Sequence, residues 1–124
     1  MNKKILVAED SSVIQNLTKR ILTMQNYDIV AVKNGKQVLD RLAKDDYDLL
    51  LLDLNMPVMD GVECAKKIRS DENEKIKNLP IIAITGNAKN LSMEDFHQLG
   101  INDYLPKPLN YDDMVDMVNK YIKD

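Results

Sequence analysis

Four consecutive leucines, residues 49–52, restrict the fold of this chain more than any other feature of its sequence. Asp48 precedes the run, and Asp53 and a segment of turn-forming residues follow it. A short apolar run with charged and turn-forming borders is typical of a strand that is buried on both faces of a sheet. We therefore expect an α/β fold in which Asp53 lies at the carboxyl edge of the sheet, where open α/β folds bind their ligands.

Similar short runs recur along the chain and alternate with helical patterns, which is typical of βαβ units and a parallel sheet. We predict five helices and five strands, the strands at residues 4–8, 29–33, 49–53, 81–85 and 103–105. Right-handed crossovers would place the helices on both faces of the sheet. With 124 residues, the chain has room for one such domain with a single core.

Residues that cap helices predict where the five helices start. The expected start residues are Ser12, Asn34 or Gly35, Asp60, Ser92 and Asn110. Ser12 and Gln15 have the spacing of a capping box, in which two side chains bind free N–H groups of the first helical turn. Asp60 and Glu63 have the same spacing.

Apolar residues at helical spacing predict one face of the first and last helices. In the first helix they are Val13, Leu17, Ile21 and Met24, and in the last helix, facing inward, Met114, Val118, Tyr121 and Ile122. Cys64 is the only cysteine, which excludes an internal disulfide, and we expect it to be buried in the third helix. Residues 70–78 are rich in charged and amide side chains and predict an exposed loop.

The charge balance argues against a protein that binds nucleic acid. The chain has 17 basic and 20 acidic residues, a formal net charge of -3, no tryptophan and no basic block. The apolar run near the amino terminus is too short for a signal peptide or a membrane span. We therefore expect a cytoplasmic protein that binds neither nucleic acid nor membranes directly.

Acidic residues follow two of the predicted strands. Glu9 and Asp10 follow the first strand and Asp53 ends the leucine run, so the three carboxylates are expected to meet at one edge of the sheet. Two carboxylates about 4 Å apart repel each other by about 4 kcal/mol at an effective dielectric constant of about 20, so such a cluster favours a bound cation. Mg²⁺ suits these oxygen ligands and typically joins carboxylates to a phosphate. The alternative is three solvated acids that share no site.

Two further strand ends point into the same region. Thr85 offers a hydroxyl there, and Gly86 is small enough to let a ligand approach the backbone. Lys107 lies between Pro106 and Pro108 and provides a point charge suited to a phosphate oxygen. A cis bond between Lys107 and Pro108 carries little penalty. An ordinary surface lysine is the alternative interpretation of Lys107.

In this combination the sequence resembles the receiver domain of two-component response regulators, in particular the stand-alone chemotaxis type. The resemblance covers the chain from Lys3 to about Ile122. The matching positions are Glu9-Asp10, Leu52 to Gly61, Thr85-Gly86, Tyr104 and Lys107-Pro108. The resemblance implies a doubly wound, flavodoxin-like sheet with strand order 2-1-3-4-5.

The resemblance implies that Asp53 is the phosphoacceptor, which takes a phosphoryl group from a histidine kinase or a histidine phosphotransfer protein and becomes 4-aspartylphosphate. Asp10 and Asp53 would bind Mg²⁺ directly, the Asn55 backbone carbonyl would complete the protein ligands, and Glu9 would bind largely through water. Such a domain catalyses its own phosphorylation, mainly through positioning and electrostatics.

Three other residues would respond to the phosphoryl group. Lys107 would balance its charge, and the Thr85 hydroxyl would bind one of its oxygens. By the same resemblance, Tyr104 would move inward as Thr85 shifts, which would alter the face formed by the fourth helix, the fifth strand and the fifth helix. The alternative is a Tyr104 that is simply half-buried at a strand edge.

Asn55 and Asn87 are expected to tune the lifetime of the acyl phosphate. Both flank the route of an attacking water, and an amide orients water without acting as a general base at neutral pH. We therefore expect slow dephosphorylation without a partner. Gly86 replaces the alanine that is frequent at its position in the family, which would loosen that loop slightly. His97 is expected to be a solvated surface residue without a metal role.

By resemblance, the first helix and the loop after the fifth strand are expected to recognise the phosphodonor. The apolar residues of this surface would be Ile14, Leu17, Leu105, Pro106 and Pro108. The alternative, favoured for Leu17, is that Ile14 or Leu17 belongs to the core. The protein would be a monomer or a weak dimer that forms on phosphorylation.

Three other interpretations use the same features. An aspartate-nucleophile phosphatase of the haloacid dehalogenase type also needs Mg²⁺, but its motif has a second aspartate where this chain has Asn55. A flavodoxin-like binding module needs hydroxyls and glycines around its phosphate, where this chain has Glu9 and Asp10. The third is a receiver domain from a hybrid histidine kinase or a larger regulator. Met1 and an end shortly after the last helix favour a stand-alone receiver domain of residues 1–124, acting as a switch or in a phosphorelay.

Overall fold

The computed structural model describes residues 2–56, 58–86 and 91–123, which form five strands and six helices. All five strands are parallel and form one sheet in the order β2-β1-β3-β4-β5. The strands are β1 (Lys4–Ala8), β2 (Asp28–Val32), β3 (Leu49–Asp53), β4 (Ile81–Thr85) and β5 (Asp103–Pro106). The predicted α/β fold and the strand order implied by the resemblance are both confirmed.

The strand bounds predicted from the apolar runs agree closely with the structure. β1, β3 and β4 have the predicted bounds, β2 begins and ends one residue earlier, and β5 continues to Pro106. β3 lies between β1 and β4, and its four leucines have no exposed surface. Because helices cover both faces of this central strand, every position needs an apolar side chain rather than every second one.

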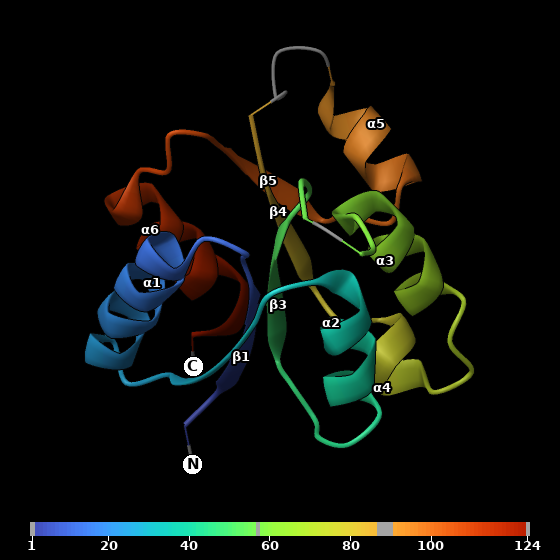
Figure 1. Cartoon of the computed structure of the whole chain (residues 1–124), viewed down its shortest axis with the longest axis horizontal. Coiled ribbons are helices and arrows are strands. Elements are labelled where there is room, and N and C mark those ends of the chain that lie inside the picture. The colour runs from blue at the N-terminus through green and yellow to red at the C-terminus, as the bar shows by residue number, and fades with distance from the viewer. Residues whose placement is uncertain (1, 57, 87–90, 124) are drawn as a thin grey trace.

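Helices cover the sheet on both faces, as Figure 1 shows. On one face lie α1 (Ser12–Met24) and α6 (Tyr111–Ile122). On the other face lie α2 (Gly35–Leu42), α3 (Gly61–Arg69), α4 (Glu74–Lys77) and α5 (Met93–Gln98). This doubly wound arrangement leaves the carboxyl ends of the strands accessible, since the crossover helices pack against the faces of the sheet and not against its edge.

The start of α1 differs from its prediction by one residue. The N-cap is Ser11, whose hydroxyl oxygen accepts a hydrogen bond from the Ile14 N–H, and Ser12 is the first helical residue. Gln15 therefore stands four residues after the cap, and its side chain does not complete a capping box. Two adjacent serines offer the same capping chemistry, so the sequence could not distinguish them.

The apolar face predicted for α1 was wrong at three of its four residues. Val13, Leu17 and Met24 are exposed, Val13 by 77% and Met24 by 74%, whereas Ile21 is half-buried and packs against the core. The buried residues of α1 are Thr18 and Leu22. Apolar side chains occur around much of this helix, so periodicity did not identify the face that packs on the sheet.

The short helix α4 was not predicted, because it lies in the segment expected to be a loop. Asn73 caps it, and its Oδ1 accepts a hydrogen bond from the Lys75 N–H. The fourth and fifth predicted helices are therefore α5 and α6. Other expectations are met: Cys64 is fully buried, and in α6 the three predicted residues Met114, Val118 and Ile122 are buried while Tyr121 is half-buried.

None of the helices in the described ranges combines the length and the hydropathy that crossing a bilayer requires.

Candidate functional site

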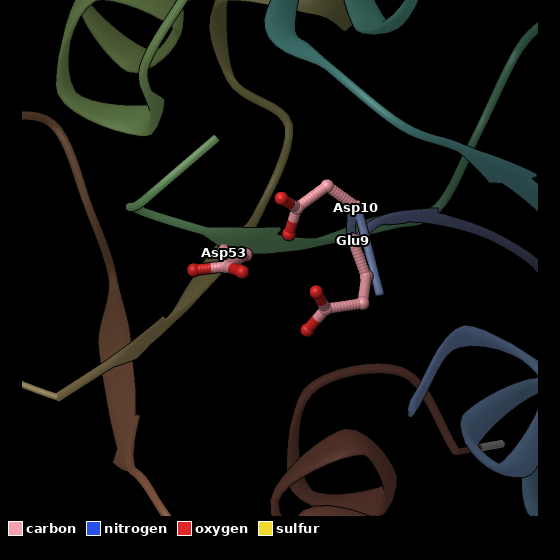
Figure 2. A group of neighbouring side chains, drawn as sticks. All are labelled: Glu9, Asp10 and Asp53. Atoms are coloured by element: carbon pink, nitrogen blue, oxygen red, sulfur yellow. The ribbon is translucent and has the colours of Figure 1, made fainter. Parts of the chain in front are cut away.

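The carboxyl ends of β1 and β3 bring three acidic side chains together, as the sequence predicted (Figure 2). One carboxylate oxygen from each of Glu9, Asp10 and Asp53 lies within 4.8 Å of the other two. The two strands are neighbours, so the residues at their carboxyl ends leave the sheet side by side. Asp53 and Glu9 are only 1% and 2% exposed, whereas Asp10 is exposed.

Asp53 accepts two hydrogen bonds through the same oxygen. Its Oδ1 accepts one from the Asn55 backbone N–H at 2.9 Å and one from Lys107 Nζ at 2.9 Å. The ion pair joins the end of β3 to the loop after β5, and the lysine side chain remains 32% exposed. Lys107 thus provides a positive charge beside a cluster of three carboxylates, where Coulomb attraction is stronger than in water.

A glycine lets the chain after β3 return close to the end of that strand. A Cβ atom on Gly61 would lie 2.7 Å from Leu54 Cα and 2.8 Å from the Asp53 carbonyl oxygen, which leaves no room for a side chain. The Gly61 N–H also donates to the Leu54 carbonyl at 3.1 Å. This contact fixes the start of α3 against the backbone that positions Asp53.

Glu9 has the least favourable surroundings for a negative charge in this cluster. Its Oε2 accepts a hydrogen bond from the Ser11 N–H at 3.0 Å, whereas its buried Oε1 has no hydrogen-bond partner among the described residues. Burial raises the pKa of Glu9 to about 7; the Ser11 hydrogen bond opposes the rise, and the charge of Asp53 adds to it. The cluster is therefore strained electrostatically unless a proton or a cation joins it.

The donor atoms of the cluster fit Mg²⁺. All of them are carboxylate oxygens, and the unsatisfied Oε1 of Glu9 is an acceptor suited to the water shell of a cation. Mg²⁺ keeps several waters and binds one or two carboxylates directly, which matches one exposed aspartate, Asp10, beside the buried Asp53.

In metal-free buffer, we expect the free energy of unfolding to fall as the pH rises from about 4.5 to about 7. The pKa of Glu9 is raised from 4.5 to about 7 in the folded protein, so the folded state binds this proton more tightly than the unfolded state does. That stabilisation is fully present below the unfolded pKa and is lost as the pH rises through the folded pKa. One pKa unit corresponds to about 1.4 kcal/mol, so the loss is at most about 3.5 kcal/mol.

Urea unfolding in EDTA, at several pH values between about 4 and 8, measures this change. Glu9→Gln is the matched control, because the amide has the shape of the carboxyl group and does not titrate. Parent and variant that lose the same stability over this range would contradict the assignment of the effect to Glu9. Mg²⁺ should reduce the loss in the parent only.

The predicted residues at the ends of β4 and β5 lie next to each other. Thr85 is 1% exposed and pairs with Pro106, and its carbonyl accepts a hydrogen bond from the Lys107 N–H at 2.9 Å. The peptide bond between Lys107 and Pro108 is cis, which the sequence allowed. A Cβ atom on Gly86 would meet no atom of the described residues within 4 Å, so these residues leave room for a side chain at that position.

Tyr104 is half-buried on β5 and stacks on Phe96 of α5. The ring centroids are 4.6 Å apart and the ring planes differ by 17°. Phe96 is fully buried, and it is the one buried residue of α5. Tyr104 therefore contacts the side chain that attaches α5 to the sheet.

The apolar surface predicted for donor recognition is present only in part. Leu17, Pro106 and Pro108 are exposed and Ile14 is half-buried, but Leu105 is only 3% exposed. Leu105 thus belongs to the core because it lies in β5 beneath α6, and the alternative that placed Leu17 in the core was wrong.

One residue near the site has a role that the sequence did not reveal. The Gln15 side chain donates to the backbone carbonyls of Glu9 and Val32, whereas its spacing from Ser12 suggested a helix cap. The sequence does not indicate these hydrogen-bond partners of Gln15, because they depend on how α1 packs beside the ends of β1 and β2. His97 is exposed, as predicted, and Asn87 lies outside the described residues.

Comparison with known proteins agrees with this geometry. The model of the response regulator receiver domain family matches residues 5–119. Hybrid signal transduction histidine kinase I of Dictyostelium discoideum is 37% identical over 131 residues, which cover 98% of this chain and 8% of the kinase. Chemotaxis protein CheY-3 of Vibrio cholerae is 32% identical over 120 residues, which cover 96% of this chain and 91% of that protein.

A solved structure has the same fold over its whole length. The crystal structure of the receiver domain of a sensor histidine kinase from Pseudomonas aeruginosa, with a magnesium ion coordinated in its active site cleft, has a TM-score of 0.87 and 32% sequence identity, and the match covers 100% of both chains. This chain spans only a small part of the hybrid kinases that it matches, 8% and 5% of two of them. From the match over residues 5–119 and the agreement in fold, we conclude that the chain belongs to the receiver domains of two-component response regulators.

Proposed function

We propose that this receiver domain accepts a phosphoryl group on Asp53 from the phosphohistidine of a sensor kinase or a histidine phosphotransfer protein. A carboxylate oxygen of Asp53 would attack phosphorus, the P–N bond would break, and the imidazole would leave with its electron pair and take up a proton. The observation that best supports this proposal is a carboxylate only 1% exposed, 2.9 Å from the ammonium group of Lys107 and beside two further acids.

Mg²⁺ would be bound by Asp10, Asp53 and the Asn55 backbone carbonyl, with Glu9 reached through water. The three clustered carboxylates support this assignment, as does the magnesium ion in the similar Pseudomonas aeruginosa receiver structure. When bound, the ion would contribute positive charge where the transferred group is negative. Asn55 would also orient a water for slow loss of the phosphoryl group, because its amide is not a general base.

Intact mass spectrometry after incubation with acetyl phosphate tests the proposal. We expect the parent protein to gain one phosphoryl group with Mg²⁺ and none with EDTA. A phosphorylated histidine phosphotransfer protein is the second donor, in case the small donor reacts too slowly. No gain from either donor would overturn the proposed function.

Phosphorylation would alter the face formed by α5, β5 and α6. The new phosphoryl oxygens would bind Lys107 and the Thr85 hydroxyl, which would move the Thr85 segment towards Asp53. Tyr104 on the next strand would fill the space that Thr85 leaves, and because its ring stacks on Phe96, this movement would also displace α5. Nearly complete switching needs about 5.5 kcal/mol of differential stabilisation.

The same face has a groove suited to a basic, amphipathic partner. The groove has a volume of about 740 Å³, and its lining includes apolar side chains such as Met93, Tyr104 and Met117. Its charged lining residues are the acids Asp113 and Asp116 and the ion pair of Asp103 with Lys120. Neither Asp113 nor Asp116 forms an ion pair with a basic residue in the described ranges. A groove lined by apolar residues and by three acids against one lysine favours a target segment that carries aliphatic and basic side chains.

We expect Tyr104→Ala to uncouple this face from the phosphorylation site. In the parent, beryllofluoride, a mimic of the phosphoryl group, should shift the methyl NMR signals of Met93 and Met117. In Tyr104→Ala these shifts should fall by more than half although beryllofluoride still binds, because the ring that links the site to α5 is absent. Tyr104→Phe keeps the ring and should keep the shifts. Shifts of parental size in Tyr104→Ala would contradict the proposed switch.

The phosphodonor would dock on α1 and the loop after β5. Val13 and Leu17 expose apolar surface on α1. Pro106 exposes it at the end of β5, and Pro108 exposes it on the loop that contains Lys107. Exposed apolar side chains beside a reactive group suit docking onto a helical partner. Receiver domains with this fold occur both within hybrid histidine kinases and in the short chemotaxis protein, so either context is compatible with this role.

A further inference from the structure

The side chain of Gln15 joins three backbone segments at the acidic cluster. Its Nε2 donates to the Val32 carbonyl at 2.9 Å and to the Glu9 carbonyl at 3.1 Å. The Val32 carbonyl also accepts a hydrogen bond from the Glu9 N–H at 3.0 Å. Both backbone groups of Glu9 are therefore hydrogen-bonded, and one glutamine amide links the end of β2, the end of β1 and the second turn of α1.

The position of Gln15 on α1 is itself fixed. Its backbone N–H donates to the Ser11 carbonyl at 2.9 Å, and Ser11 is the N-cap residue whose N–H donates to Glu9 Oε2. The connection from β1 to α1 thus contains Glu9, Asp10 and Ser11 only, and hydrogen bonds with Gln15 close it at both ends.

Both residues that this arrangement orients belong to the acidic cluster. Glu9 and Asp10 each have a carboxylate oxygen within 4.8 Å of one on Asp53. Without the Gln15 amide, the Glu9 carbonyl would lose this hydrogen bond and the Val32 carbonyl would keep the one from the Glu9 N–H. The backbone that positions both carboxylates would then gain freedom. Groups that orient metal ligands in this indirect way affect metal affinity by about 10- to 100-fold when they are removed.

We infer that Gln15 is a positioning residue of the divalent-cation site, which holds the Glu9–Asp10 backbone in the geometry that binds the ion. This inference rests on the proposed Mg²⁺ site but not on phosphoryl transfer, since it concerns the affinity for the metal alone. Gln15 would act through the backbone of Glu9, to whose carbonyl it donates a hydrogen bond, and not as a ligand of the ion.

Calorimetric titration with MgCl₂ at constant pH tests the inference without any phosphodonor. Gln15→Met has nearly the same size and lacks N–H donors, and we expect its Mg²⁺ dissociation constant to rise about 10- to 100-fold. Gln15→Glu also lacks the donors but adds a negative charge that would attract the cation. Weaker Mg²⁺ binding in Gln15→Glu would therefore show that losing the hydrogen bonds that position the Glu9–Asp10 backbone outweighs the attraction of the added negative charge.

Asn16→Met is the matched control, because it replaces an amide by methionine at the next, exposed position of α1. Urea unfolding in EDTA establishes that each variant is folded, and Gln15→Ala replaces Gln15→Met if the larger side chain prevents folding. Folded Gln15 variants that bind Mg²⁺ within about twofold of the parent would overturn this inference and leave the proposed function intact. A parent that binds no Mg²⁺ would overturn both.

Discussion

The Asp53→Asn protein is expected to gain no phosphoryl group from acetyl phosphate, whereas the parent gains one in the presence of Mg²⁺. An amide is not a nucleophile towards phosphorus, and the substitution also removes the charge of a proposed Mg²⁺ ligand. The fold should survive, because the amide oxygen still accepts the hydrogen bonds that Asn55 N–H and Lys107 Nζ donate to Asp53 Oδ1. The expected effect is therefore complete loss of modification in a folded protein.

Asp48→Asn is the matched control for this substitution. Asp48 precedes β3 at the opposite edge of the sheet, where its carboxylate accepts a hydrogen bond from the Lys4 N–H at 2.8 Å. The same change of charge there should leave phosphorylation unaltered. A Mg²⁺-dependent phosphoryl gain in Asp53→Asn, mapped by fragmentation to another side chain, would contradict the assignment of Asp53.

Lys107→Met is expected to slow phosphorylation by about 100- to 1000-fold while Mg²⁺ binds more tightly. Removing one preorganised positive group from a site of developing negative charge typically costs a rate factor of that size. Tighter metal binding follows because Lys107 Nζ lies 2.9 Å from Asp53 Oδ1 and competes with the cation for this carboxylate. Phosphorylation rates from mass spectra and calorimetric Mg²⁺ titration measure the two effects separately.

Lys120→Met provides a control with the same change of charge. Lys120 lies on α6, is 69% exposed, and pairs with Asp103 at 3.6 Å. It should alter neither the rate nor the Mg²⁺ affinity. A Lys107→Met protein with a parental phosphorylation rate would mean that Lys107 is an ordinary surface lysine, and weaker Mg²⁺ binding would mean that it supports the metal site.

The sheet was predictable because strands that are buried on both faces consist of short, uninterrupted apolar runs. The leucines of β3 indicated a strand covered on both faces, and the carboxyl ends of parallel strands share one edge of the sheet. Glu9, Asp10 and Asp53 were therefore expected at one edge, and the strand order that makes β1 and β3 neighbours came from the family resemblance. Strand order does not determine the chemical roles of these acids.

The errors concern features that depend on packing between elements. Ser11 and Ser12 are equally good caps, and only the path of the chain after β1 decides between them. Leu17 lies at helical spacing from other apolar residues of α1, which suggested a position in the core. The helix packs on the sheet through Leu22 instead. The role of Gln15 was missed for the same reason, since its acceptors lie on two other elements. Local sequence carries no information about such distant partners.

Because one buried side chain attaches α5, we expect the domain to open in at least two steps: α5 alone, and the sheet with the rest of the core. Opening of this six-residue helix would expose Phe96 and uncover the Tyr104 ring that stacks on it, whereas opening of β3 or β4 would expose the whole core. Local opening with so little newly exposed apolar surface costs a small fraction of the global unfolding free energy. The amides of α5 should therefore exchange with solvent long before those of the central strands. Helix α5 can thus unfold and refold repeatedly while the strands that position the three acids remain folded.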